Sequence, residues 1–164
     1  MIIKDSMVII HLAKITLLET SCNYFKKVII PKKVYEEIII GKEKGYSEVI
    51  IFEDLIKAGK IEVTCIKNKH FIKKANEFNI QEGEGEAVAL YWEKKADYLA
   101  TDDDNLRKKG SILNINIIGT PAIIIKLYKE KKVEKEKFLR SVMELKEIGW
   151  FNSSVIDKIL MEAK

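Results

Sequence analysis

The sequence predicts an α/β protein, a three-layer sandwich in which a mostly parallel central sheet of about five strands carries helices on both faces. Short β-branched or apolar runs alternate along the chain with longer segments of helical spacing. Such alternation favours parallel strands joined by right-handed crossovers. The length of 164 residues suits one substantial core and is too short for two ordinary domains. We therefore expect a single domain over residues 1–164.

Five short runs, each bounded by turn or charged residues, are the strand candidates. They are Met1–Lys4, Val28–Ile30, Ile61–Cys65, Tyr98–Ala100 and Ile112–Ile118. Isoleucine, valine and aromatic residues favour the pleated, half-buried surface of a sheet. We expect these runs to form the sheet in a parallel arrangement.

The segments between the strand candidates carry apolar residues at helical spacing. They are Met7–Ile15, Lys32–Ile40, Ser47–Ala58, Phe71–Phe78 and Gly85–Lys95. The last part of the chain, 121–164, is expected to be mainly helical. Pro121 suits the first turn of a helix, Gly149 can end one, and Ser153 or Ser154 can cap the last.

Cysteine, histidine and hydropathy patterns exclude several classes of protein. Cys22 and Cys65 lie far apart without a CxxC motif, so we expect two buried thiols and neither a zinc site nor a disulfide framework. His11 and His70 are isolated, which disfavours RNA cleavage by a histidine pair. The apolar runs are shorter than the roughly 20 residues that span a bilayer, and the first residues lack a signal-peptide pattern. We expect a soluble, cytoplasmic protein with no membrane partner.

The net charge is +4, and lysine supplies nearly all of the positive side because Arg107 and Arg140 are the only arginines. Lysine suits general attraction to phosphate better than bidentate reading of bases. Lys67–Lys74 and Lys126–Arg140 are basic stretches that could attract a phosphate backbone. The second stretch interleaves glutamates, which favours a solvated helical face.

Acidic residues gather where the predicted strands end or where the adjoining helices begin. They are Asp5, the pair Glu36 and Glu37, the group Glu82, Glu84 and Glu86, and the run Asp102 to Asp104. Open α/β sheets bind ligands beyond the carboxyl ends of their strands. Converging carboxylates raise one another's pKa values unless a cation compensates them, and Mg²⁺ prefers such oxygen ligands. Each acid taken alone also suits a helix cap or a helix N-terminus.

Five stretches together carry a family resemblance. They are DSMVIIHLAKI at 5–15, VIIPKKVYEEI at 28–38, QEGEGEAVALYWEKKADYLATDDDNLRKKG at 81–110, IIGTPAIIIKLYK at 117–129 and GWFNSSVIDKIL at 149–160. They resemble the PIN domain nucleases, and more narrowly an uncharacterised branch related to type II toxin–antitoxin ribonucleases. The resemblance implies a divalent-metal-dependent endoribonuclease that uses Mg²⁺ or Mn²⁺ and leaves a 5′-phosphate and a 3′-hydroxyl.

The resemblance also assigns roles to four acids. Asp5 would be the first acid, and Glu37 the second, with Glu36 as the fallback. Asp102 would be the fourth acid, with Asp103 as the alternative, because Arg107 falls at the offset that the family leads us to expect. These acids would hold the metal ion.

For the third acid, the family pattern of Gly-Glu, a small residue and Glu-Ala matches both Glu84 and Glu86. The two point about 200° apart on a helix, so only one can ligate the ion directly. We choose Glu86 and keep Glu84 as the alternative. Many members of the family carry aspartate here. The hydroxyl of Thr120 is expected to hydrogen-bond a ligating carboxylate or a metal-bound water.

RNA is the partner that the resemblance implies, and an antitoxin protein is a further expectation from it. The rival interpretation is a non-catalytic PIN-like module that binds RNA or a protein and keeps its acids for structure. Homodimerisation is a separate hypothesis. It rests on the isoleucines of 38–40 and 123–125, which are too numerous for one face of each helix, although they could instead fill the core.

Overall fold

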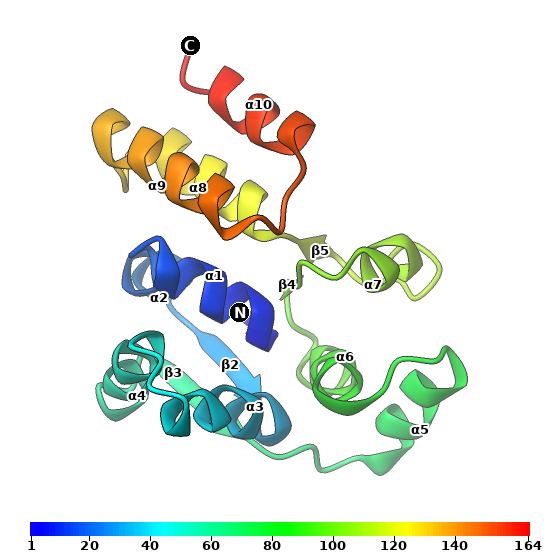
Figure 1. The fold of residues 1–164 in the computed structure, drawn as a ribbon. Helices are drawn as coiled ribbons and strands as arrows, with labels where there is room; N and C mark the ends of the chain where they lie inside the picture. The colour runs from blue at the N-terminus through cyan, green and yellow to red at the C-terminus, as the bar shows by residue number, and fades with distance from the viewer.

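A five-stranded sheet forms the centre of the protein in a computed structural model that describes all of residues 1–164 (Figure 1). The strands lie in the order β3-β2-β1-β4-β5, and all neighbouring strands are parallel. Their bounds are β1 (Ile2–Lys4), β2 (Val28–Pro31), β3 (Ile61–Thr64), β4 (Tyr98–Ala100) and β5 (Ile117–Ile118). The predicted α/β class with a largely parallel sheet of about five strands is confirmed.

Ten helices surround this sheet. They are α1 (Ser6–Lys14), α2 (Leu18–Phe25), α3 (Lys32–Glu43), α4 (Glu48–Lys57), α5 (Lys69–Glu77), α6 (Glu82–Lys94), α7 (Asp104–Lys109), α8 (Thr120–Lys129), α9 (Lys135–Ile148) and α10 (Ser153–Met161). All elements after β5 are helices, and none of the ten is long and apolar enough to cross a membrane.

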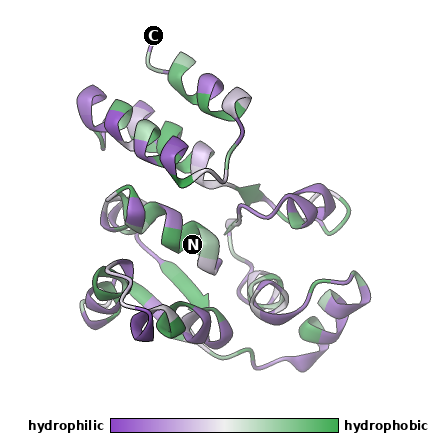
Figure 2. Ribbon diagram, in the orientation of Figure 1, coloured by the Kyte–Doolittle hydropathy of each residue, from purple (hydrophilic) through white to green (hydrophobic).

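Two hydrophobic cores lie on opposite faces of the sheet, because successive side chains of a strand point in opposite directions. In β1, Ile2 belongs to the larger core and Ile3 to the smaller one. Residues of α1 to α4 and α8 to α10 build the larger core, while α5 to α7 contribute to the smaller one. The helices are green and purple by turns in Figure 2, as expected where one face of each packs on the sheet. The layering agrees with the predicted sandwich.

Three local predictions differ from the structure. The short helices α2 and α7 were not expected, because α2 has a largely polar sequence and α7 has only six residues. The predicted strand Ile112–Ile118 is reduced to β5, since the residues before it form turns and Ile112 is 75% exposed. Cys22 is buried as expected, but Cys65 is exposed because it follows β3, an edge strand of the sheet.

Candidate metal centre

The carboxyl ends of four neighbouring strands bring the predicted acids to one edge of the sheet. Helix α3 follows β2, Asp5 follows β1, the segment Thr101–Asp103 follows β4, and Gly119 follows β5. Backbone hydrogen bonds extend the pairing beyond the strands, from Asp5 N to Ala100 O at 3.0 Å and from Thr101 N to Ile118 O at 3.0 Å. This is the edge where an open α/β sheet offers a ligand site.

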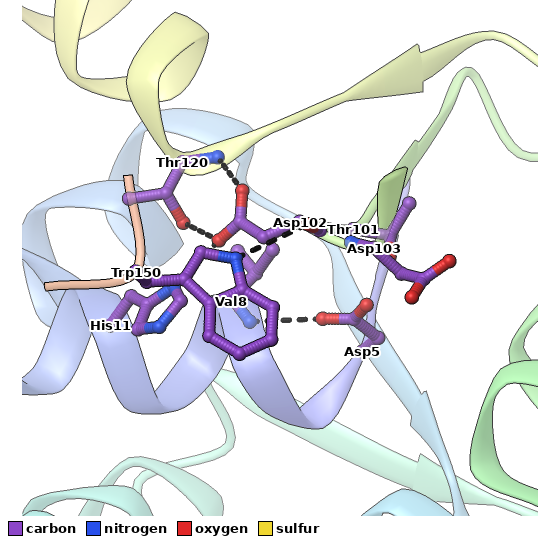
Figure 3. A network of polar contacts seen from close by, with 8 residues as sticks. All are labelled: Asp5, Val8, His11, Thr101, Asp102, Asp103, Thr120 and Trp150. Atoms are coloured by element: carbon purple, nitrogen blue, oxygen red, sulfur yellow. Dashed lines mark hydrogen bonds and ion pairs between the residues drawn. The ribbon is translucent and has the colours of Figure 1, made fainter. Parts of the chain in front are cut away.

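Asp5 is buried at the start of α1, and one of its oxygens caps that helix. Its Oδ1 accepts a hydrogen bond from Val8 N at 2.9 Å (Figure 3). Burial raises the pKa of Asp5 to about 7, although hydrogen bonds from Thr101 and Val8 act in the opposite direction. The neighbouring charges of Asp102 and Glu84 raise this pKa further. Asp5 is therefore both a helix cap and an acid that has no nearby cation to compensate it.

Glu84 stands at the start of α6 and faces the same acidic environment. Burial is the main cause that raises its pKa, followed by the charges of Asp103 and Glu37, while Lys109 lowers it. Since Glu84 in turn raises the pKa of Asp5, these four acids lie close enough to repel one another. Such a group is stabilised by a positive charge placed among them.

Glu37 and Asp103 complete this acidic cluster, which consists of Asp5, Glu37, Glu84 and Asp103. The Oε1 atom of Glu37 accepts a hydrogen bond from Gly83 N at 3.1 Å. A Cβ on Gly83 would collide with the Glu37 carboxylate, so the glycine leaves room for this carboxylate to lie against the start of α6. Asp103 caps α7 through a 2.7 Å hydrogen bond from Leu106 N to its Oδ1.

Glu86 and Glu36, the other two candidates, face different neighbours. The Oε2 atom of Glu86 accepts a hydrogen bond from Lys33 N at 3.1 Å, at the start of α3. Glu36 is exposed and lies 3.7 Å from the ammonium of Lys32. Glu84 and Glu86 therefore have different neighbours. The charge of Glu84 acts on Asp5, whereas Glu86 bonds to Lys33 N. These surroundings favour Glu84 as the third acid over Glu86, our choice from the sequence. They also favour Glu37 over Glu36.

Asp102 is buried as deeply as Asp5, but both of its oxygens are occupied (Figure 3). Oδ1 accepts a hydrogen bond from Thr120 N at 2.7 Å. Oδ2 accepts a hydrogen bond from the Thr120 hydroxyl at 2.5 Å and lies 2.7 Å from His11 Nδ1. The Thr120 hydroxyl thus bonds one of the predicted acids, and this bond joins the end of β4 to the start of α8, while the metal-related role expected of Thr120 stays a prediction.

His11 and Trp150 were not anticipated at this edge. His11 is buried on α1, and its ring lies 5.8 Å from that of Trp150 and 5.5 Å from that of Phe151. The indole of Trp150 donates a hydrogen bond to Asp102 O at 3.4 Å. One signal was available in the sequence, because His11 is a polar residue on the buried helical face of Val8 and Leu12.

The donor set of the cluster fits a hard divalent cation in its chemistry. No three side chains of aspartate, glutamate, histidine or cysteine converge tightly enough to form a ready-made cage. Mg²⁺ needs no such cage, because it takes one or two carboxylates directly and keeps several waters. Asp5, Glu84, Asp103 and Glu37 offer only oxygen atoms, and burial together with the charges of neighbouring acids raises the pKa values of Asp5 and Glu84.

Comparison with known proteins gives one family. No curated protein and no solved structure matched the chain. The model of a family described as PIN domain matches residues 1–164, the full length described here. This match agrees with the parallel α/β fold and with the acids at its carboxyl edge, in a family of nuclease type. The chain therefore belongs to the PIN domain family.

Proposed function

We propose that this protein is an endoribonuclease that depends on Mg²⁺ or Mn²⁺ and hydrolyses phosphodiester bonds of RNA. The observation that carries the proposal is the pair of acids with raised pKa values, Asp5 and Glu84, which lie near one another at the carboxyl edge of the sheet. Membership of a nuclease-type family supports it. A cation placed among these acids would relieve their repulsion, and the carboxyl edge of an open α/β sheet is where such folds bind ligands.

The proposed ligands of the ion are Asp5 and Glu84, with Asp103 and Glu37 holding its waters. Glu84 takes the place that the sequence had suggested for Glu86, because Glu86 is engaged at the start of α3. Asp102 has a positioning role in this proposal, since Thr120 and His11 occupy its oxygens. Asp102 thereby holds the Thr101–Asp103 segment against α8.

When bound, the divalent ion would supply an activated water and offset the negative charge on the leaving oxygen. The protein's own contribution is placement. Val8 N and Thr101 orient the carboxylate of Asp5, and Gly83 N orients that of Glu37. Water attacks the phosphorus, the bond to the 3′ oxygen breaks, and the products carry a 5′-phosphate and a 3′-hydroxyl.

The test is the substitution Asp5→Asn, with cleavage of a panel of single-stranded and structured RNAs followed in Mg²⁺ and in Mn²⁺. Asparagine keeps the size and the capping oxygen but removes the charge that holds a hard cation. We expect cleavage to be abolished while circular dichroism stays that of the folded protein. Asp54→Asn on the exposed side of α4 is the matched control, and it should cleave like the wild type.

A second control addresses general phosphate attraction. Lys131→Ala should weaken RNA binding slightly, in a salt-dependent way, without abolishing cleavage. If the wild type cuts no faster than Asp5→Asn with either metal, the nuclease proposal fails for this chain. RNA binding retained by both proteins would then favour the non-catalytic module.

An antitoxin partner and a homodimer stay predictions. Ile38, Ile123 and Ile124 fill the core of the monomer, so the isoleucine excess that suggested a dimer is now largely explained. Ile40, which is 57% exposed, is what remains of that argument. Sedimentation at micromolar concentration decides the matter, because a purely monomeric protein would remove the dimer hypothesis.

A further inference from the structure

A cavity of about 280 Å³ lies between α7, α8 and α10, on the β5 side of the acidic cluster. Arg107 and Lys158 supply its two cations, and Gly119, Pro121 and Ala122 form part of its wall. We propose that this cavity is a subsite for the RNA backbone, in which Arg107 and Lys158 bind a phosphate that flanks the cleaved bond. The inference rests on the proposed nuclease function and adds a substrate-binding site to it.

The position of the cavity follows from the strand order. Its wall residue Gly119 ends β5, which pairs with β4, and Asp102 lies beyond the end of β4. A Cβ on Gly119 would lie 3.0 Å from Asp102 Oδ1 and 3.3 Å from Arg107 Nη1. Neighbouring strands are about 4.8 Å apart. A strand of RNA that crosses the carboxyl edge at Asp5 therefore passes directly from the acidic cluster to Arg107.

Both cations of the cavity are free to bind a ligand. Neither Arg107 nor Lys158 belongs to any ion pair of the protein, whereas Arg140, the other arginine, pairs with Glu136. A guanidinium matches the geometry of phosphate oxygens through two parallel hydrogen bonds, and an ammonium adds a point charge. The first backbone N–H of α8 cannot contribute, because Thr120 N already donates to Asp102. The side chains are therefore the phosphate ligands.

Charge complementarity indicates RNA as the occupant. The acidic cluster repels a polyanion, so a substrate phosphate beside it needs cations close by to hold the strand at the edge. Arg107 and Lys158 are placed for this purpose at the β5 end of the edge. The apolar wall that Pro121, Ala122 and Ile125 provide suits a sugar or a base next to the bound phosphate.

The test measures binding separately from cleavage, in the full-length Asp5→Asn protein. A fluorescein-labelled single-stranded RNA is titrated by anisotropy over a range of KCl concentrations. Arg107→Gln and Lys158→Gln should each lower the affinity roughly threefold to tenfold at low salt, and reduce the slope of log K against log salt by about 0.7. Lys108→Gln, on the same helix but outside the cavity, is the matched control and should change neither quantity.

A third variant blocks the cavity without changing the charge. Ala122→Phe places a larger side chain on the exposed start of α8 and should lower RNA affinity while the salt slope stays the same. Should Arg107→Gln fail to fold, Lys158→Gln and Ala122→Phe carry the test alone. Thermal unfolding checks the folding of each variant.

Equal losses of affinity in Lys108→Gln and in the two cavity variants would overturn the subsite, because the attraction would then be general. Unchanged binding in Lys158→Gln and Ala122→Phe would also overturn it. A wild type that cleaves RNA while the cavity variants bind normally removes only the subsite. If the wild-type protein does not cleave RNA, the nuclease proposal fails instead.

Discussion

Asp5 and Asp102 stand at the ends of two neighbouring strands and are almost equally buried, at 3% and 2% exposure. Their surroundings are opposite. Asp102 accepts hydrogen bonds from the backbone and hydroxyl of Thr120 and contacts His11, so that no oxygen is left without a partner. Asp5 accepts hydrogen bonds from Val8 N and from the side chain of Thr101, but burial raises its pKa to about 7.

The difference between Asp5 and Asp102 shows that burial by itself does not decide how a carboxylate is engaged. Burial of a carboxylate is costly unless donors or cations compensate the lost hydration. Asp102 obtains this compensation within the protein and joins β4 to α8. Asp5 also accepts hydrogen bonds, from Val8 N and Thr101, but burial still raises its pKa and no cation acts on it, so a bound cation would stabilise it. Four experiments test this contrast.

The largest effect is expected for Asp102→Ala. Removal of the carboxylate leaves Thr120 N, its hydroxyl and His11 buried without partners, and should lower the free energy of unfolding by about 4 kcal/mol. Denaturant unfolding measures the loss. Asp103→Ala is the control, since the hydrogen bond it removes is a helix cap worth about 1 kcal/mol, and the loss of its charge also relieves repulsion in the acidic cluster. Equal losses in the two variants would contradict the contrast.

Asp5→Asn should raise the stability of the protein at neutral pH. The folded pKa of about 7 lies above the ordinary value of 3.8, so the folded state favours the protonated acid. The contribution of Asp5 to stability is therefore fully present below about pH 4 and is lost as the pH rises to about 7. Relative to the wild type, we expect the variant to gain on the order of 3 kcal/mol over that window.

Urea unfolding at a series of pH values, without divalent ions, follows this difference. Added Mg²⁺ should then stabilise the wild type more than Asp5→Asn, because the ion replaces the missing compensation. A stability difference between the two proteins that does not vary with pH would show that Asp5 ionises normally in the folded state.

Glu84 and Glu86, both on α6, test where the acidic cluster ends. Glu84→Gln should weaken Mn²⁺ binding by roughly tenfold or more, since it removes a charge beside Asp5. Glu86→Gln should leave Mn²⁺ affinity unchanged, because its contact is with Lys33 N. Isothermal titration measures both constants. The opposite ranking would return the third acid to Glu86, the choice made from the sequence.

The smallest effect is expected for His11. His11→Leu removes the Nδ1 contact with Asp102 and should cost about 1 kcal/mol of stability. His11→Asn places an amide nitrogen near the position of Nδ1 and should restore part of the loss. Thermal unfolding of the two variants provides the comparison. If His11→Asn is no more stable than His11→Leu, packing against Trp150 and Phe151 is what His11 contributes.

Much of the architecture was predictable from the sequence, because the signals are local. Short apolar or β-branched runs indicated four of the strands at nearly their observed bounds, and helical spacing indicated the long helices. The position of Asp5 after the first run placed it at the carboxyl edge. The helix α7 escaped prediction because six residues give too short a period to recognise.

The sequence by itself determined the parallel sheet, its acidic carboxyl edge and the small group of acids from which the proposed metal ligands come. Tertiary structure alone decided which acids face one another. Glu84 and Glu86 are two residues apart and fit the same motif, but only the packing of α6 on α3 separates their environments. His11 meets Asp102 across 91 residues of chain, a contact that no local pattern encodes. Hydrogen-bond partners distant in sequence therefore decide whether a buried acid is satisfied or is free for a metal ion.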